Sequence, residues 1–147
     1  MLYISTAVGP VTTAVTGTIL RSAQAHNAAN GITGVLCQGQ GIYVQVLEGE
    51  RGKVEALYAR IVLDKRHHNV TLRQQTDISH RRYGKWAMAH IDLAQVTDVD
   101  KPTQNVAPDL SPAPQLVFDP YTATGEQVMA KMDELITLGK VMTVPVV

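Results

Sequence analysis

The sequence of 147 residues is poor in several features, and each shortage excludes a class of protein. A single cysteine, Cys37, excludes an internal disulfide framework and a four-cysteine zinc site. No apolar run reaches the roughly 18 residues of a membrane span and the N-terminus lacks a signal pattern, so we expect a cytoplasmic protein. Positive charge is not in excess either: the formal net charge is zero, which disfavours a dedicated nucleic-acid binder.

Sequence motifs for hydrolysis and nucleotide binding are also missing. The chain contains no phosphate-binding GxxxxGK loop followed by serine or threonine, no GxGxxG turn and no GxSxG elbow. Five histidines are present, but none of them has the HxxxH or HExxH spacing of a metal site. We therefore expect no metal centre, and neither a hydrolase nor a nucleotide triphosphatase has support from the residues.

Hydrophobic periodicity predicts a ferredoxin-like α+β fold over residues 1–92, with the order β-α-β-β-α-β-β and two helices on one face of the sheet. The predicted strands are Leu2–Ala7, Ile32–Cys37, Gly41–Leu47, Val70–Ser79 and Tyr83–Asp92. The first predicted helix is Val11–Asn27, which Asn30-Gly31 brings to an end. The second follows Glu48-Gly49 and has an apolar face of Val54, Leu57, Tyr58, Ile61 and Val62.

The composition changes after Asp92. Five of the seven prolines lie between there and Pro120, which excludes a continuous helix and predicts an irregular strap. The spacing from Thr124 to Gln127 is that of a capping box. An amphipathic stripe follows it, made of Val128, Met129, Met132, Leu135 and Ile136. We therefore expect a folded domain over 1–92 and, over 93–147, a proline-rich strap with a helical cap.

Strand parity identifies side chains that share a face of the sheet, because alternate residues point to opposite faces. On the third predicted strand Gln45 lies on the face opposite Val44 and Val46. A buried amide needs hydrogen-bond partners, and Tyr3, which shares a face with Ser5 on the first strand, could supply one. For a sheet of unknown family, satisfaction of Gln45 by neighbouring backbone is the more ordinary interpretation. The opposite face of the sheet is apolar and carries Ile4, Val44 and Val46. We expect the helical cap to dock on this face.

The fifth predicted strand and the two helices add further candidates. Trp86, Met88 and His90 share a strand face, where they could simply be core. Asn27 ends the apolar stripe of the first helix, where an amide normally bonds its own backbone. Arg66 follows the second helix, where solvation explains a basic residue adequately. Amides and one cation suit the carbonyl and imide edge of a planar heterocycle, and the aliphatic side chains of Ile19 and Ile61 would flank its faces.

Five segments in one colinear register resemble the BLUF family of blue-light-sensing, flavin-binding domains, over about residues 1–92. The segments are LYIS at Leu2–Ser5, HNAANGITGVLC at His26–Cys37, YVQVLEGE at Tyr43–Glu50, LYARIVLDKRHHNV at Leu57–Val70 and RRYGKWAM at Arg81–Met88. The combination of NGITGxL, QVLEG, DxRH and WxM is highly specific. Since the chain after Asp92 does not resemble an enzymatic output module, the resemblance favours a short stand-alone member.

The resemblance implies a role for each matching residue. Tyr3 resembles the family's photoactive tyrosine and Gln45 its switching glutamine, and both would also contact the flavin. Trp86 and Met88 resemble the pair on the last strand that is linked to signal output. The other residues that resemble FAD-binding positions are Ile19 and Ile61 on the ring faces, Asn27 at the imide edge, His26 beside it, and Asp64, Arg66 and His67 at the flavin-binding arginine. Ala23 stands where some members carry serine.

The resemblance thus implies a photoreceptor and not a catalyst. Light-driven electron and proton transfer between Tyr3 and non-covalently bound FAD would leave Gln45 with rearranged hydrogen bonds, and that rearrangement would be the signal. The expected partners are a separate downstream signalling protein and further copies of the chain, in a dimer or larger ring, without nucleic acid or membrane. The alternative is a ferredoxin-like ligand-binding or protein-interaction module without photochemistry. A flavin oxidoreductase is disfavoured because a nicotinamide-binding signature is missing.

Overall fold

The computed structural model describes residues 1–9, 13–39, 41–92, 122–137 and 141–142. Its strands are β1 (Leu2–Ala7), β2 (Thr33–Gly39), β3 (Ile42–Glu48), β4 (His67–Gln74), β5 (Ala89–Asp92) and β6 (Val141–Met142). Its helices are α1 (Thr13–Asn30), α2 (Arg51–Val62) and α4 (Gly125–Thr137). This order confirms the predicted ferredoxin-like β-α-β-β-α-β-β arrangement followed by an amphipathic helix.

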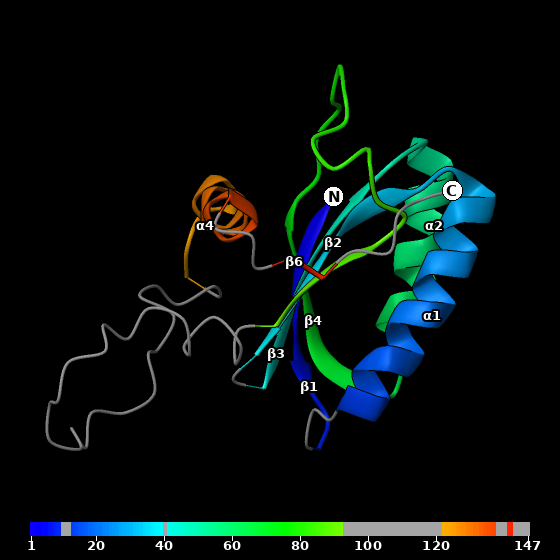
Figure 1. Ribbon diagram of the computed structural model, residues 1–147, viewed down its shortest axis with the longest axis vertical. Coiled ribbons are helices and arrows are strands. Elements are labelled where there is room, and N and C mark those ends of the chain that lie inside the picture. Colours follow the sequence, from blue (N-terminus) through cyan, green and yellow to red (C-terminus); the bar gives the residue numbers. More distant parts are fainter. Residues whose placement is uncertain (10–12, 40, 93–121, 138–140, 143–147) are drawn as a thin grey trace, which may run out of the picture.

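The strands form one mixed sheet in the order β4-β1-β3-β2-β5-β6. Neighbouring strands are antiparallel except for β2 and β5, which are parallel. Figure 1 shows α1 and α2 together on one face of the sheet and α4 on the opposite face. Because β1 and β3 are interior strands, the side chains that they point toward α1 and α2 are enclosed between the sheet and the helices.

Two glycines determine how α1 joins the sheet. Gly31 follows the last residue of α1 and has a φ of +65°, the left-handed conformation that glycine adopts at low cost. Gly34 lies on β2 opposite Leu47, and a Cβ atom there would overlap the carbonyl oxygen of Val46. The close approach of β2 to β3 therefore depends on the missing side chain at Gly34.

Each face of the sheet has its own hydrophobic core. The α4-side core joins apolar residues of β1, β2, β3 and β5 to the buried side of α4; from the sheet it includes Leu2, Ile4, Val35, Cys37, Val44, Val46, Ala89 and Ile91, and from α4 it includes Val128, Met132 and Leu135. The predicted docking of the cap on this face is thus confirmed. The helix-side core lies under α1 and α2 and consists of Tyr3, Ile32, Leu36, Tyr43, Leu47, Val54 and Met88.

The start of α4 confirms the predicted capping box. The backbone N–H of Thr124 donates to Gln127 Oε1 at 2.9 Å, and the backbone N–H of Gln127 donates to Thr124 Oγ1 at 3.2 Å. These reciprocal bonds satisfy amide groups that have no partner inside the helix. They place the apolar stripe of α4 against the sheet from its first turn.

The fifth predicted strand, Tyr83–Asp92, is wrong over its first half, because β5 begins only at Ala89. Before β5 the chain makes a turn in which the backbone N–H of Trp86 donates to the carbonyl oxygen of Tyr83 at 3.3 Å, and the N–H of Gly34 on β2 donates to the carbonyl oxygen of Trp86 at 3.1 Å. A side chain also holds this segment. The backbone N–H groups of Arg82 and Tyr83 donate to the buried carboxylate of Glu48 at 2.9 and 3.0 Å. A carboxylate that accepts two consecutive backbone amides bends the chain there, so strand parity does not apply to residues 83–88.

The prediction that Trp86 shares a face with Met88 is wrong for the same reason. Trp86 packs against the α4-side core, whereas Met88 is fully buried in the helix-side core. His90 pairs with Leu36, which belongs to the helix-side core, so His90 does share the face of Met88. The short segment 82–88 therefore presents side chains to both faces of the sheet.

The fourth strand is also displaced from its predicted position. β4 spans His67–Gln74 and not Val70–Ser79, so His67 belongs to the sheet beside β1. The predicted strap lies outside the described residues. Within the part of the chain that the structure describes, no helix has the length and apolar character needed to cross a membrane.

Candidate functional site

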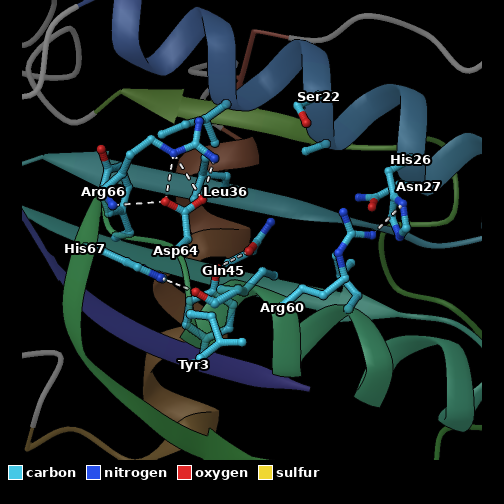
Figure 2. Close-up of a pocket in the computed structure, with 16 residues that line it drawn as sticks. Tyr3, Ser22, His26, Asn27, Leu36, Gln45, Arg60, Asp64, Arg66 and His67 are labelled. Carbon is cyan, nitrogen blue, oxygen red and sulfur yellow. Dashed lines mark hydrogen bonds and ion pairs between the residues drawn. The ribbon is translucent and has the colours of Figure 1, made fainter.

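A cavity of about 280 Å³ lies between the two helices and the sheet (Figure 2). α1 lines one side of it, α2 and the turn after α2 line the other, and the inner strands form the floor. The lining residues are Tyr3, Ile19, Ser22, Ala23, His26, Asn27, Leu36, Tyr43, Gln45, Leu57, Arg60, Ile61, Leu63, Asp64, Arg66 and His67.

The fold brings every predicted cofactor-binding residue to this one cavity. These residues come from distant parts of the chain: Tyr3, then Ile19, His26 and Asn27, then Gln45, and finally Ile61, Asp64, Arg66 and His67. The predicted output pair is separated. Met88 contacts Gln45 behind the cavity, whereas Trp86 lies on the α4 side of the sheet.

Sequence reasoning missed several lining residues, namely Ser22, Leu36, Tyr43, Leu57, Arg60 and Leu63. Spacing could have found some of them. Ser22 is three residues after Ile19, and residues three or four apart on a helix lie on one face. Tyr43 has the same strand parity as Gln45. Arg60 gave no signal, because an exposed arginine on a helix is ordinarily only solvated.

A buried chain of hydrogen bonds runs through the floor of the cavity. Tyr3 stands directly opposite Gln45 in the pairing of β1 with β3, and its phenol donates to Gln45 Oε1. Gln45 Nε2 donates to the sulfur of Met88 at 3.4 Å. The exposed fractions are 4% for Tyr3, 5% for Gln45 and 0% for Met88, so water does not compete for these contacts. The amide of Gln45 therefore connects β1 to the segment before β5.

The phenol of Tyr3 is held in its protonated form. Burial raises the pKa of Tyr3 far above its usual value, and the neighbouring Tyr58 and Asp64 raise it further. The ring of Tyr58 lies 5.6 Å from that of Tyr3, which encloses the phenol from the α2 side. Tyr3 is thus a hydrogen-bond donor over the whole physiological pH range, and Gln45 Oε1 is its acceptor.

Asn27 is the second buried amide that lines the cavity, with 1% of its surface exposed. Its Nδ2 donates to the carbonyl oxygen of Ala87 at 2.8 Å, which ties α1 to the segment before β5. Its Oδ1 is buried and has no hydrogen-bond partner among the described residues. An unpaired buried carbonyl oxygen costs free energy, so this atom is an acceptor available to a ligand that carries an N–H group.

A carboxylate orients the arginine at the other end of the cavity. Asp64 accepts from the backbone N–H of Arg66 at 2.9 Å and from its Nε at 2.9 and 3.0 Å, and Nη2 adds a further contact. The bonded guanidinium lowers the pKa of Asp64, while Asp64 raises the pKa of Arg66. Both groups therefore stay charged, and the pair places a fixed cation beside the cavity.

His67 links β4 to β1 and α2. Its Nε2 lies 2.5 Å from the carbonyl oxygen of Ile61, and because a carbonyl only accepts, Nε2 carries a proton. Its Nδ1 lies 2.8 Å from the hydroxyl of the fully buried Ser5, which donates to Nδ1 when the ring is neutral. His67 therefore holds the C-terminal end of α2 against the sheet and closes one side of the cavity.

At the opposite end of the view from Arg66, Arg60 reaches across to α1 (Figure 2). Its Nη1 lies 3.3 Å from Nδ1 of His26, which makes the imidazole nitrogen an acceptor. This contact is exposed, in contrast to the buried floor. The cavity thus combines a deep floor of phenol and amides with aliphatic walls and two exposed cations, a set suited to a planar ring with hydrogen-bonding edges.

Comparison with known proteins gives a consistent result. The family model described as BLUF, "Sensors of blue-light using FAD", matches residues 1–89. The photoactivated adenylate cyclase subunit alpha of Euglena gracilis is 37% identical over 98 residues, which are 67% of this chain and 9% of that protein. This chain therefore spans about a tenth of the length of that curated relative.

Solved structures agree with the fold described above. A bacterial light-regulated adenylyl cyclase superposes with a TM-score of 0.64 at 35% identity, covering 67% of this chain and 29% of that one. The dark-state structure of BlrB, a BLUF protein, superposes with a TM-score of 0.71 and covers 94% of this chain and 93% of that one. At 24% identity, the second similarity concerns the fold alone.

Proposed function

The chain belongs to the BLUF family of blue-light sensors, and on this basis we propose that it is a flavin photoreceptor whose signal is a rearrangement of the hydrogen bonds of Gln45. The buried chain from Tyr3 through Gln45 to Met88 is the observation that carries this proposal. The alternative function, a ligand-binding or protein-interaction module without photochemistry, is not favoured by the family match. It would also leave the buried contact of a phenol with an amide beside a cavity without an explanation.

The cavity fits the ring of a flavin by its donor and acceptor atoms. Asn27 Oδ1 is buried without a partner among the described residues, and the N–H of the flavin imide would satisfy it. Arg66 would bind a ring carbonyl, with Asp64 holding it in place, and Ile19 and Ile61 would cover the ring faces. His26 and His67 complete the binding set. The family membership makes the cofactor a flavin, and we propose that it is FAD, bound without a covalent bond.

A bound flavin would absorb blue light and would supply an acceptor for one electron. Tyr3 is the side chain of this cavity that can release both an electron and a proton, and its buried phenol is already directed at Gln45. Gln45 accepts at Oε1 and donates at Nε2, so it could take up the phenolic proton at its oxygen while a proton from its nitrogen passes to the bound flavin, which would then have gained one electron and one proton from Tyr3. No substrate is consumed in this exchange, and we propose that the chain is not itself an enzyme.

The switch follows from the two ends of the Gln45 amide. In the structure Oε1 faces the Tyr3 hydroxyl and Nε2 faces the Met88 sulfur. If the amide rotates by half a turn, its oxygen faces a thioether, which is an acceptor and cannot donate. The contact between Gln45 and Met88 is then lost, while Nε2 turns toward Tyr3. A local rotation thus changes how β3 is connected to the segment before β5.

The output partner is proposed from the rest of the chain and from the relatives. The similar proteins named above include a photoactivated and a light-regulated adenylyl cyclase. We propose that residues 1–92 form the sensor and that residues 93–147 form its proline-rich strap and helical cap. We further propose that a cytoplasmic homo-oligomer of this chain passes the signal to a separate protein. The position of α4 on the sheet supports a cap that can report to such a partner.

The visible spectrum of the purified protein tests the proposal. Protein expressed with ample flavin should show flavin absorbance, and heat or acid should release free FAD into the supernatant. Blue light should shift the flavin band to longer wavelength, and the shift should reverse in the dark. Protein from which no flavin can be released would contradict the proposed function. Flavin-loaded protein whose spectrum is the same before and after illumination would also contradict it. Chromatography of the released flavin distinguishes FAD from FMN and riboflavin.

A further inference from the structure

The segment 82–88 connects the cavity to α4, although neither the sheet ladder nor a helix includes it. At its C-terminal end two cavity residues hold it: Gln45 Nε2 donates to the sulfur of Met88, and Asn27 Nδ2 donates to the carbonyl oxygen of Ala87. Gln24 adds a third contact from α1, to the carbonyl oxygen of Met88 at 3.2 Å. A change at the Gln45 amide therefore acts directly on this end of the segment.

The N-terminal end of the segment holds α4. The phenol of Tyr83 donates to Asp133 Oδ1 at 2.8 Å, and Arg82 Nη1 lies 3.5 Å from Asp133 Oδ2. Tyr83 is only 2% exposed and its ring belongs to the α4-side core. Asp133 lies in the second half of α4, on a partly buried position. These contacts join the C-terminal half of α4 to the chain that leads into the cavity.

Glu48 makes the segment a rigid connection. Its carboxylate is 6% exposed and accepts the backbone amides of Arg82 and Tyr83, and it lies on β3 three residues after Gln45. The backbone at Tyr83 is thus fixed to the same strand that carries the switching amide. The backbone N–H of Trp86 donates to the carbonyl oxygen of Tyr83 at 3.3 Å, so a displacement of Met88 passes through this turn to the side chain of Tyr83, while Glu48 holds the Tyr83 backbone.

The other end of α4 is attached elsewhere. Arg73 of β4 donates to the carbonyl oxygen of Ala123, two residues before α4 begins. Gly125 packs so closely on Gln74 that a Cβ atom would overlap the Gln74 side chain. The N-terminal end of α4 is therefore fixed on β4, whereas its second half depends on Asp133 for polar contact with the segment 82–88.

We propose that the Tyr83–Asp133 hydrogen bond is the contact through which the state of the cavity controls the second half of α4. The inference rests on the proposed function, since Gln45 must switch for the segment to move. Apolar contacts under α4 are non-directional and tolerate small displacements, but a hydrogen bond weakens steeply as its geometry changes. Loss of the Gln45–Met88 contact would move the segment and break the Tyr83–Asp133 bond, and α4 would then loosen about its fixed N-terminal end.

Light-dependent hydrogen exchange of the flavin-loaded full chain tests this proposal. In the wild-type protein, blue light should accelerate amide exchange in residues 130–137 by about tenfold, the effect of losing one hydrogen bond to a charged group. Tyr83→Phe removes the donor and keeps the ring. It should show the fast exchange already in the dark, with little further change in light, while its reversible spectral shift is retained.

A matched control separates this role from general helix stability. Glu134→Gln breaks the exposed ion pair with Lys131 on the same helix and leaves the segment 82–88 untouched, so its light-minus-dark difference should equal that of the wild type. Asp133→Ala removes the acceptor of the Tyr83 phenol and should reproduce Tyr83→Phe. A normal spectral shift without any change of exchange in α4, or an unchanged light response in Tyr83→Phe, overturns the proposal. A wild-type protein that binds flavin without a spectral shift overturns the proposed function instead.

Discussion

Tyr3 and Gln45 are paired residue to residue in the register of β1 with β3, and the phenol of one donates to the amide oxygen of the other. The contact is thus set by the backbone of two interior strands and not by flexible loops. A slip of β1 by one residue against β3 would turn Tyr3 toward α4, away from Gln45 and the cavity. The position of the photochemical pair therefore depends on the stability of the sheet itself.

The first prediction is that Tyr3→Phe abolishes the light response without loss of flavin. The substitution removes the phenolic hydrogen bond to Gln45 and keeps the ring that packs against Tyr58. We expect the free energy of unfolding to fall by only about 1 kcal/mol, the usual net value of one hydrogen bond. Absorbance before and after blue light measures the response, and a normal red shift in this variant would refute the role of Tyr3.

The second prediction concerns the side-chain amide of Gln45. Gln45→Leu keeps a side chain of similar size but removes both the acceptor for Tyr3 and the donor to Met88. We expect flavin to remain bound, because Asn27 and Arg66 are unchanged, and we expect no reversible shift of its band. Gln24→Leu is the control, since Gln24 contacts the carbonyl of Met88 but does not line the cavity. It should keep the shift, and its failure to do so would argue against Gln45 as the switch.

The third prediction tests the close contact between β2 and β3. Gly34→Ala places a Cβ atom against the carbonyl oxygen of Val46, so the strands must separate under the cavity. We expect the free energy of unfolding to fall by about 3 kcal/mol, in the range of severe core strain. Gly52→Ala in α2 is the matched control, because a Cβ atom added there meets no other atom within 4 Å. This substitution should leave the free energy of unfolding unchanged or raise it by up to about 1 kcal/mol. Urea unfolding of both variants measures the difference.

The sequence predicts most of the fold and the composition of the cavity, but not the segment 82–88. Parity on a regular strand placed Tyr3 and Gln45 correctly, since alternation holds wherever the ladder is continuous. The same rule failed at Trp86, because the carboxylate of Glu48, distant in sequence, bends the chain before β5. The contact of Asp133 could not be predicted for a similar reason. Its partner Tyr83 is 50 residues away, and an acidic residue on a helix is ordinarily solvated.

The fourth prediction is a pH dependence of stability that arises from His90. This side chain is buried on β5, its Nε2 has no partner among the described residues, and burial lowers its pKa although Asp92 partly opposes the effect. As pH falls below the ordinary histidine pKa of about 6.5, the unfolded chain binds the proton before the folded chain does. The free energy of unfolding should therefore decrease from pH 7 toward pH 5.

His90→Leu removes the titrating group and should flatten this decrease, whereas His68→Gln, at an exposed position of β4, should leave it unchanged. Chemical unfolding at several pH values gives the comparison. A profile of His90→Leu that runs parallel to the wild type between pH 7 and 5 would show that other groups cause the pH dependence.

The last prediction uses Cys37 as a chemical probe of the α4-side core, which it shares with Val128 and Met132. The thiol is 4% exposed, and burial raises its pKa to about 12. Only the thiolate reacts with disulfide reagents, so at pH 8 the folded protein should be labelled far more slowly than the chain unfolded in urea. Because the sequence has one cysteine, the mass of the intact protein reports labelling at this position alone.

If α4 loosens in light, illumination should accelerate labelling, and Tyr83→Phe should label at the faster rate in darkness. A dark rate for the native protein equal to that of the unfolded chain would contradict the buried position of Cys37, and equal rates in light and dark would show that α4 stays docked.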